Sequence, residues 1–250
     1  MASQPEIHLY TTQTPNGIKI SILLEELGIP YQHTKIDMAK NTQKQPWFLE
    51  NNPNGRIPAL TDKFTDGMQI NVFESGSIMQ YLVERYDTER KLSFQPGTRE
   101  HIEINDELAL LFEFWCWTDA RSSQPLHSQY APEHIKRYQN GTRRLYRVLD
   151  THLANSKADY LVGNKCTIAD IAHWGWISAA GWAGVDNNEF PALKAWEESM
   201  WARPALKKGA NVPDKYGMKE FLADKDRMDK YAADSRKWIQ SGMKEDAAKK

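Results

Sequence analysis

Strand and helix patterns are distributed unevenly along this 250-residue chain, and their distribution limits the folds it can adopt. The first third interleaves helical patterns with short segments that favour strands: EIHLYT, YQHTKID, RIPALTD and QINVF. The order is βαβ followed by αββα, which predicts a small four-stranded mixed sheet with helices on both faces. After a polar stretch with Pro96 and Gly97, only helical patterns follow.

We therefore predict an α/β domain over residues 1–88, a linker over 89–97 and an all-α domain over 98–205. In the second domain, the stretch CTIADIAHWGW has Thr167 three residues before Asp170, which is typical of a capping box at a helix start. Residues 206–250 form a separate C-terminal extension with an amphipathic helical pattern amid dense charge. This helix either packs on the domain surface or serves as a lid or partner helix.

Composition and charge exclude several classes of function. A net charge of -1 and a pI of about 6.7 argue against a nucleic-acid partner. No apolar window is long enough for a membrane helix, and the first residues lack a signal-peptide pattern, so we expect no membrane partner and a cytoplasmic location. Two cysteines exclude a disulfide framework, and the histidines lack ligand spacing, so no metal is expected.

Three short motifs in the first domain combine turn residues with the start of a helix or strand. In NPNGRIPALTD, Pro58 withholds an N–H at a strand entry, so the backbone there lies at a sheet edge or pairs with a ligand. In FESGSI, Glu74 or Ser75 is either an N-cap or part of an anion site that receives a carboxylate and its ammonium group.

The third motif, TPNG, precedes the first helical run, which ends at Leu27. Asn16 is either its N-cap or a working group, and Thr14 is either a turn hydroxyl or its helper. All three motifs fall at one end of the same predicted sheet, where open α/β sheets bind ligands. Their convergence favours a shared binding pocket.

Taken together, YTTQTPNG, NPNGRIPALTD, FESGSIMQYL and CTIADIAHW resemble the cytosolic glutathione transferases over about residues 6–205. TPNG, LEELGIPY and NPNGRIPA are similar to the bacterial Nu class and to fungal transferases that resemble the nitrogen-regulator prion protein. The resemblance implies a thioredoxin-like N-terminal domain, an all-α C-terminal domain, glutathione as co-substrate, no metal, and a homodimer.

The resemblance also implies roles for individual residues. The Ile57 backbone, beside a cis Pro58, would pair with the cysteinyl part of glutathione, and Asn16, helped by Thr14, would donate to its sulfur. Tyr10, near the end of the first strand, is the rival for that activating role. Glu74 and Ser75 would hold the γ-glutamyl head, and Gln43 and Arg56 would lie near the glycyl carboxylate. The wall for a second substrate would comprise Phe112, Trp115, Trp117 and Arg121.

Two functions fit these implied roles. The first is an enzyme that uses the glutathione thiolate for conjugation to electrophiles, peroxide reduction or disulfide reduction. The stretch TDARSSQPLHS differs from the Nu class at this place, which weakens the case for disulfide reduction. The alternative is a non-catalytic glutathione-binding regulator or protein-interaction module on the same fold.

Overall fold

The computed structural model of the protein describes residues 5–118 and 132–234. Its N-terminal half contains strands β1 (Ile7–Thr11), β2 (Tyr31–Lys35), β3 (Ala59–Lys63) and β4 (Gln69–Phe73). They form one sheet in the order β2-β1-β3-β4, in which β1 and β2 are parallel and the other pairs antiparallel. The predicted four-stranded mixed sheet is thereby confirmed.

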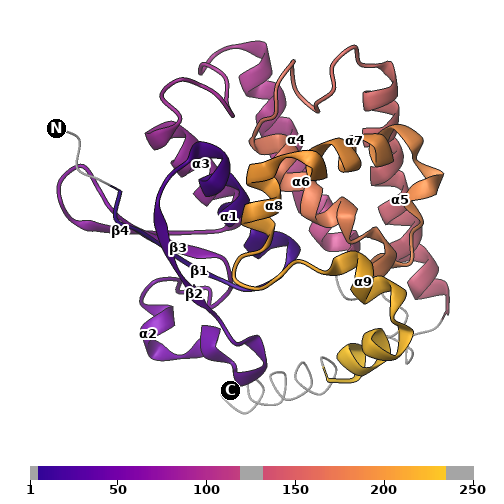
Figure 1. Ribbon diagram of the computed structural model, residues 1–250, viewed down its shortest axis with the longest axis horizontal. Coiled ribbons are helices and arrows are strands. Elements are labelled where there is room, and N and C mark those ends of the chain that lie inside the picture. The colour runs from indigo at the N-terminus through magenta and orange to yellow at the C-terminus, as the bar shows by residue number, and fades with distance from the viewer. Residues whose placement is uncertain (1–4, 119–131, 235–250) are drawn as a thin grey trace.

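Helices α1 (Pro15–Leu27) and α3 (Ser75–Tyr86) cover one face of this sheet and separate it from the helical half (Figure 1). Along β1, Ile7, Leu9 and Thr11 are buried on that side. Helix α1 ends at Gly28, whose left-handed backbone (φ 66°) closes the helix because glycine has no Cβ to clash.

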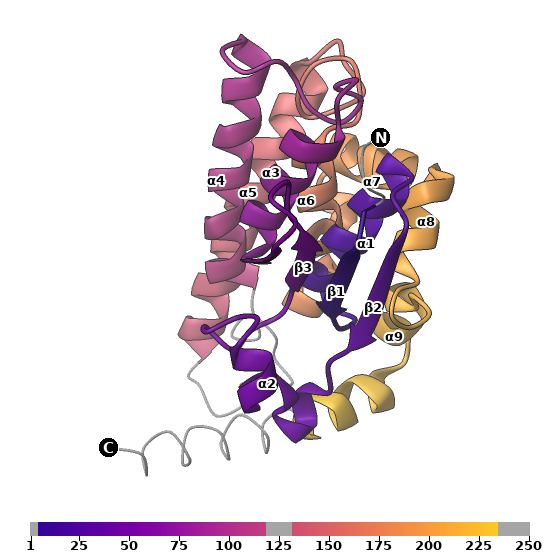
Figure 2. The ribbon, with the colours of Figure 1, turned by 90° about the vertical axis from the view of Figure 1, so that its left-hand side faces the viewer.

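The other face carries a shorter layer, which connects β2 to β3. Two 3₁₀ turns, η1 (Met38–Lys40) and η2 (Thr42–Lys44), lead into the short helix α2 (Pro46–Leu49). Phe48 of α2 packs with Ile36 and Ala59 in a small separate core, with Tyr10 and Ile57 at its margin. Figure 2 shows α2 apart from the helical half, near the lower end of the strands.

In the second half, the described residues form helices joined by turns and contain no strand, as the sequence predicts. Its main helices are α4 (Arg99–Thr118), α5 (Pro132–Asn155), α6 (Ile168–Ser178) and α7 (Pro191–Ala202), with 3₁₀ turns η3 (Ala180–Ala183) and η4 (Asn187–Glu189). Every residue of α6 is buried, so this helix forms the centre of the bundle.

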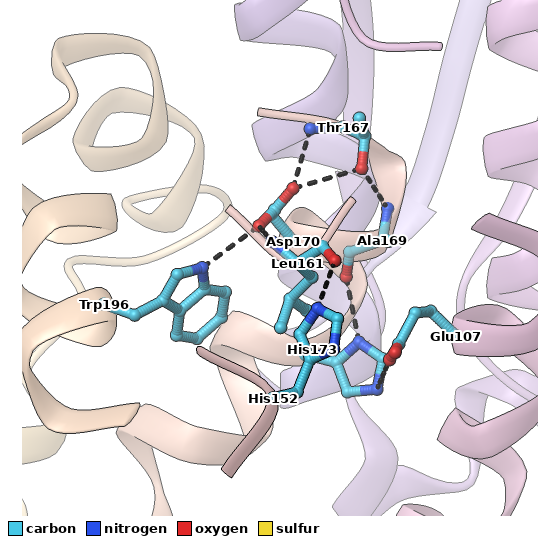
Figure 3. A network of polar contacts seen from close by, with 8 residues as sticks. All are labelled: Glu107, His152, Leu161, Thr167, Ala169, Asp170, His173 and Trp196. Atoms are coloured by element: carbon cyan, nitrogen blue, oxygen red, sulfur yellow. Dashed lines mark hydrogen bonds and ion pairs between the residues drawn. The ribbon is translucent and has the colours of Figure 1, made fainter. Parts of the chain in front are cut away.

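Helix α6 begins with the predicted capping box. The Thr167 side chain accepts from the Ala169 N–H, and Asp170 Oδ2 accepts from the Thr167 N–H at 2.8 Å. Asp170 also accepts from the Leu161 N–H and from the Trp196 indole, at 2.9 and 3.0 Å (Figure 3). The box therefore joins three segments of the bundle, and it is fully buried.

The C-terminal region differs from the single amphipathic helix that the sequence indicates. Helix α8 (Pro204–Ala210) crosses the predicted boundary at 205–206 and packs along α1. Next come α9 (Met218–Ala223) and a helical stretch over 225–234, interrupted at Asp224. Asp224 Oδ1 accepts from the Arg227 N–H at 2.9 Å, so it caps a second helix where a continuous one was expected.

Helix α1 also joins the two halves through specific contacts. Ser21 Oγ donates to the Gly209 carbonyl at 2.8 Å, and Arg203 donates twice to the Glu26 carboxylate at 2.7 Å. A Cβ on Gly209 would lie 2.4 Å from Ile22 Cα, so only glycine permits this approach. In the part of the chain that the structure describes, no helix is both long and apolar enough to cross a bilayer.

Candidate functional site

The strand register brings the three sequence motifs to one edge of the sheet. Tyr10 near the end of β1 pairs with Ala59 at the start of β3, and Ala59 pairs with Phe73 at the end of β4. The segments just beyond these residues, 12–16, 57–58 and 74–75, therefore emerge side by side. Thr11 pairs with Lys35 at the end of β2, which places the 36–45 connection at the same edge.

The N-terminus of α1 is organised differently from the sequence expectation. Thr14 is the N-cap: its backbone is extended, and its Oγ1 accepts from the Gly17 N–H at 3.1 Å. Pro15 follows at the first helical position, where its missing N–H is not needed. The interpretation of Asn16 as the N-cap is therefore wrong. It lies in the first turn, and its Oδ1 accepts from Lys19 Nζ at 2.7 Å.

Gly17 lets the loop before α1 lie against the helix. A Cβ at this position would stand 2.1 Å from the Thr12 carbonyl oxygen and 2.6 Å from Thr11 Oγ1. The first turn of α1 contains no acidic side chain. The positive end of its dipole is thus left without a carboxylate from its own first turn, and can stabilise an anion from outside.

The loop between α2 and β3 is held by a residue that the sequence analysis missed. Asn52 is buried; its Nδ2 donates to the Arg56 carbonyl at 2.7 Å, and its Oδ1 accepts from the Asn54 N–H at 2.9 Å. The Asn-Pro turn sequence could have identified it as an Asx turn. The loop leads to the Ile57–Pro58 peptide bond, which is cis, as the resemblance implies.

Glu74 has an unusual backbone for a residue with a side chain, with φ at 68°. It precedes the first residue of α3, Ser75, without capping the helix through its side chain. Its Oε1 instead accepts from Asn54 Nδ2 at 2.9 Å. This hydrogen bond ties the start of α3 to the turn before Pro58. Strained backbone such as that of Glu74 is concentrated at functional sites.

Gln43 and Arg56 lie on either side of the same turn. Gln43 is 2% exposed, and within the described residues its Oε1 has no hydrogen-bond partner. Its backbone carbonyl oxygen lies 3.0 Å from where a Cβ on Gly55 would stand, next to the exposed Arg56. The candidate binding residues of the N-terminal half therefore belong to connected loops.

Tyr10 lies within β1 and not in the loop that follows. It pairs with Thr34 and Ala59, and its ring packs edge-on against Phe48 at 6.1 Å between centroids. Its side chain points to the face that α2 covers, opposite to the α1 face. The rival for thiol activation is thus part of the small core around α2.

The residues predicted to form a second-substrate wall lie at the end of α4 and just beyond it in the sequence. Phe112, Trp115 and Trp117 belong to α4, but their side chains, and Arg121 altogether, lie outside the described residues. Cys166 is buried, and burial raises the pKa of its thiol well above the usual value, so it is a poor nucleophile. Among the residues described, no group of histidine, cysteine and acidic side chains could hold a metal.

Comparisons with known proteins identify the family of this chain. The family model for the glutathione S-transferase N-terminal domain matches residues 5–84, and that for the C-terminal domain matches residues 122–208. The disulfide-bond oxidoreductase YfcG of Escherichia coli is 38% identical over 208 residues, which cover 80% of this chain and 92% of that protein. The chain belongs to the glutathione S-transferase family.

Solved structures support the same assignment. A glutathione transferase homologue from Lodderomyces elongisporus, with two glutathione molecules per subunit, has a TM-score of 0.77 at 37% identity, covering 83% of this chain and 99% of that one. The transferase URE2P6 from Phanerochaete chrysosporium, in complex with oxidised glutathione, has a TM-score of 0.74 at 35% identity, covering 84% and 96%. The family resemblance and the two-part fold inferred from the sequence are confirmed.

Proposed function

We propose that this protein is a glutathione-dependent enzyme that ionises the glutathione thiol at the N-terminus of α1, with Asn16 as the donor to sulfur and Thr14 as the cap that holds the turn. One observation supports this proposal: three features lie at the same edge of the sheet. They are the N-terminus of α1, whose first turn has no acidic residue, the cis Ile57–Pro58 bond, and the start of α3 at Glu74 and Ser75. A thiol with a pKa of about 8.5 is mostly protonated at neutral pH. Each pKa unit by which the site lowers it is about 1.4 kcal/mol of preference for the thiolate.

The remaining residues would orient the tripeptide. The Ile57 backbone pairs with its cysteinyl part, and Glu74 and Ser75 hold the γ-glutamyl ammonium and carboxylate. Gln43, with its buried unpaired oxygen, and the exposed Arg56 lie near the glycyl end. The second-substrate wall implied by the resemblance, Phe112, Trp115, Trp117 and Arg121, is kept in this proposal, although these side chains lie outside the described residues.

Disulfide reduction is the reaction with the most support, because a relative 38% identical to this chain is named a disulfide-bond oxidoreductase. In this reaction the glutathione thiolate attacks one sulfur of a substrate disulfide, and the other sulfur leaves as a thiolate that takes up a proton. A second glutathione, ionised in turn, attacks the mixed disulfide, which yields oxidised glutathione and the second substrate thiol. Conjugation and peroxide reduction would use the same thiolate.

The proposal also covers the domain limits, the cellular location and the oligomeric state of the enzyme. The domain limits at residues 88 and 98 and a cytoplasmic location are kept as the sequence pattern indicates them, and a homodimer is proposed from the family resemblance. Exposed apolar side chains on β4 and α4, Phe73 and Ile102, are suitable for a subunit interface, since they are 36% and 55% exposed in the single chain. Size-exclusion chromatography with light scattering tests the dimer.

The activating residue is tested by Asn16→Ala. Because Asn16 acts on sulfur, turnover should fall by well over tenfold while the affinity for glutathione stays within a few-fold. Rates are compared with an electrophile, an organic hydroperoxide and a small disulfide, and Tyr10→Phe is the matched control. Unchanged kinetics in Asn16→Ala with loss in Tyr10→Phe contradict the assignment. Glutathione binding without any turnover in the wild type would favour the regulator.

A further inference from the structure

Lys19 is an unusual residue for the interior of a helix-packing interface. It lies on α1, is 1% exposed, and is among the largest fully buried side chains of the described residues. Its Nζ donates to Asn16 Oδ1 at 2.7 Å and lies 5.9 Å from the ring centre of Trp176 on α6. Within the described part of the chain, no carboxylate lies within ion-pair distance of this ammonium.

Burial of this kind is costly. An ammonium group removed from water without a carboxylate partner loses several kcal/mol of hydration. The loss shows in the pKa of Lys19, which burial lowers to about 7. A methionine would fill nearly the same space at no such cost. Packing therefore does not account for a lysine at this position.

The contact with Asn16 suggests what the lysine does. A lysine ammonium has only donors, so the carboxamide oxygen must face it and the carboxamide NH₂ must point away. The orientation of Asn16 is thus fixed by chemistry. A donor to the amide oxygen also polarises the amide, which makes its N–H groups stronger donors.

We propose that Lys19 is a positioning residue for thiol activation: it holds Asn16 by its side-chain oxygen, presents the Asn16 NH₂ to the glutathione sulfur, and adds a buried positive charge that favours the thiolate. This inference rests on the proposed function. It adds Lys19, one turn after Asn16 on α1, as the residue that positions Asn16 for its role.

Among the described residues, the titratable groups on neighbouring elements do not cancel this charge. His173 of α6 is fully buried and neutral at pH 7, because burial, together with a smaller contribution from the charge of Lys19, lowers its pKa to about 4. Glu107 of α4 lies 3.7 Å from His173 Nε2 (Figure 3), and burial raises its pKa to about 7. At the α8 contact, Lys208 pairs with Glu25 instead.

Further groups around α1 are also engaged elsewhere. Arg203, at the start of α8, pairs with Glu26, two turns along α1 from Lys19. On the α3 side, Arg85 pairs with the buried Asp62. On β1, His8 Nε2 is hydrogen-bonded to Thr34 on the opposite face of the sheet. A thiolate bound at the N-terminus of α1 would therefore supply the counter-charge that Lys19 does not receive from the described residues.

The first test is the thiol pKa of bound glutathione in Lys19→Met, read from the ultraviolet absorbance of the thiolate against pH. We expect an increase of about one unit or more, with turnover near pH 7 about tenfold lower and recovering as pH rises. Lys19→Arg keeps the charge and should restore part of both. A wild-type thiol pKa and wild-type turnover in Lys19→Met would overturn the proposal.

A matched control separates this role from a structural one. Ser21→Ala removes another buried polar group from α1, the donor to Gly209, and should make the protein easier to unfold without moving the thiol pKa. Lys19→Met should unfold no more easily than the wild type. If Ser21→Ala raises the thiol pKa as much as Lys19→Met, the effect comes from helix packing and the proposal is wrong.

A measurement on the wild type does not depend on any variant folding. Because a bound thiolate and Lys19 would stabilise each other's charges, binding glutathione near pH 7 should release fewer protons than the thiolate formed, with absorbance and calorimetry in two buffers as the readouts. Proton release equal to the thiolate formed contradicts the proposal. If Asn16→Ala leaves the thiol pKa unchanged, the proposed activation itself fails. If Asn16→Ala raises it and Lys19→Met does not, only the role of Lys19 fails.

Discussion

The helices α1 and α6 begin with the same residue type in the same conformation and yet serve different ends. Thr14 and Thr167 are both N-caps with extended backbones, and each side chain accepts from a backbone N–H of the first turn. At α6 the third helical residue is Asp170, whose carboxylate fills the site in front of the helix. At α1 the equivalent residue is Gly17, and the corresponding space is closed to any side chain by the Thr12 carbonyl.

The N-terminus of α6 is therefore occupied by a carboxylate of the protein itself, which we call the closed site, whereas the N-terminus of α1 has none, which we call the open site. In α6 the protein supplies its own carboxylate, and four buried donors from three segments fix it. In α1 the first turn has no acidic side chain, and its Asn16 contacts the buried Lys19. A helix N-terminus that lacks its own acid, with a buried cation behind it, is suited to an anion that arrives with the substrate.

The largest effect should come from breaking the closed site. Asp170→Ala leaves the indole of Trp196 and the backbone N–H groups of Leu161 and Thr167 buried without an acceptor. We expect the free energy of unfolding to fall by about 3–5 kcal/mol, measured by chemical denaturation. Asp170→Asn keeps the shape and should lose less. A loss below about 1 kcal/mol for the alanine variant would mean that water replaces the carboxylate.

A smaller effect should follow from making the open site resemble the closed one. Asn16→Asp places a carboxylate in the first turn of α1, next to Lys19. Stability should stay equal or rise by about 0.3–1 kcal/mol, whereas the thiol pKa of bound glutathione should rise by one unit or more and turnover at pH 7 should fall at least tenfold. Turnover should recover as pH rises through the new thiol pKa. Full activity in this variant is incompatible with Asn16 as the donor to sulfur.

The smallest effect concerns the cap itself. Thr14→Val removes the hydroxyl that accepts from the Gly17 N–H and should reduce the free energy of unfolding by about 1 kcal/mol. Thr14→Ser keeps the hydroxyl and should behave as the wild type. Thermal unfolding of the three proteins checks this. No loss in Thr14→Val, or an equal loss in Thr14→Ser, which keeps the hydroxyl, would contradict the assignment of the effect to the cap.

The sequence predicted the closed site better than the open one. Thr167 and Asp170 follow a local rule at fixed spacing, so the capping box could be identified without knowledge of the fold. At α1, Asn16 is as good a cap by residue type as Thr14. The proline between them decides, because proline is favoured at the first helical position, and the threonine before it must then be the cap.

Other features depend on contacts between distant segments. The four strands and the meeting of the motifs at one sheet edge could be predicted, since alternation and turn residues are local signals. The burial of Lys19 could not, because it results from α6 packing against α1. The Asn-Pro sequence at Asn52 could have indicated its turn, but not that the side chain is buried, and Asp224 resembles any other surface aspartate within the amphipathic pattern.

The side chain of Gln13, in the loop before α1, connects the candidate site to the C-terminal region. Gln13 Nε2 donates to the Ala210 carbonyl at 2.7 Å, and Gln13 Oε1 accepts from the Asp214 N–H at 3.4 Å. Asp214 also pairs with Lys35 at the end of β2. The loop that presents Asn16 is synthesised about 200 residues before the segment that holds it in place. A growing chain can therefore complete its four-stranded sheet before it contains the residues that fix the shape of the loop before α1.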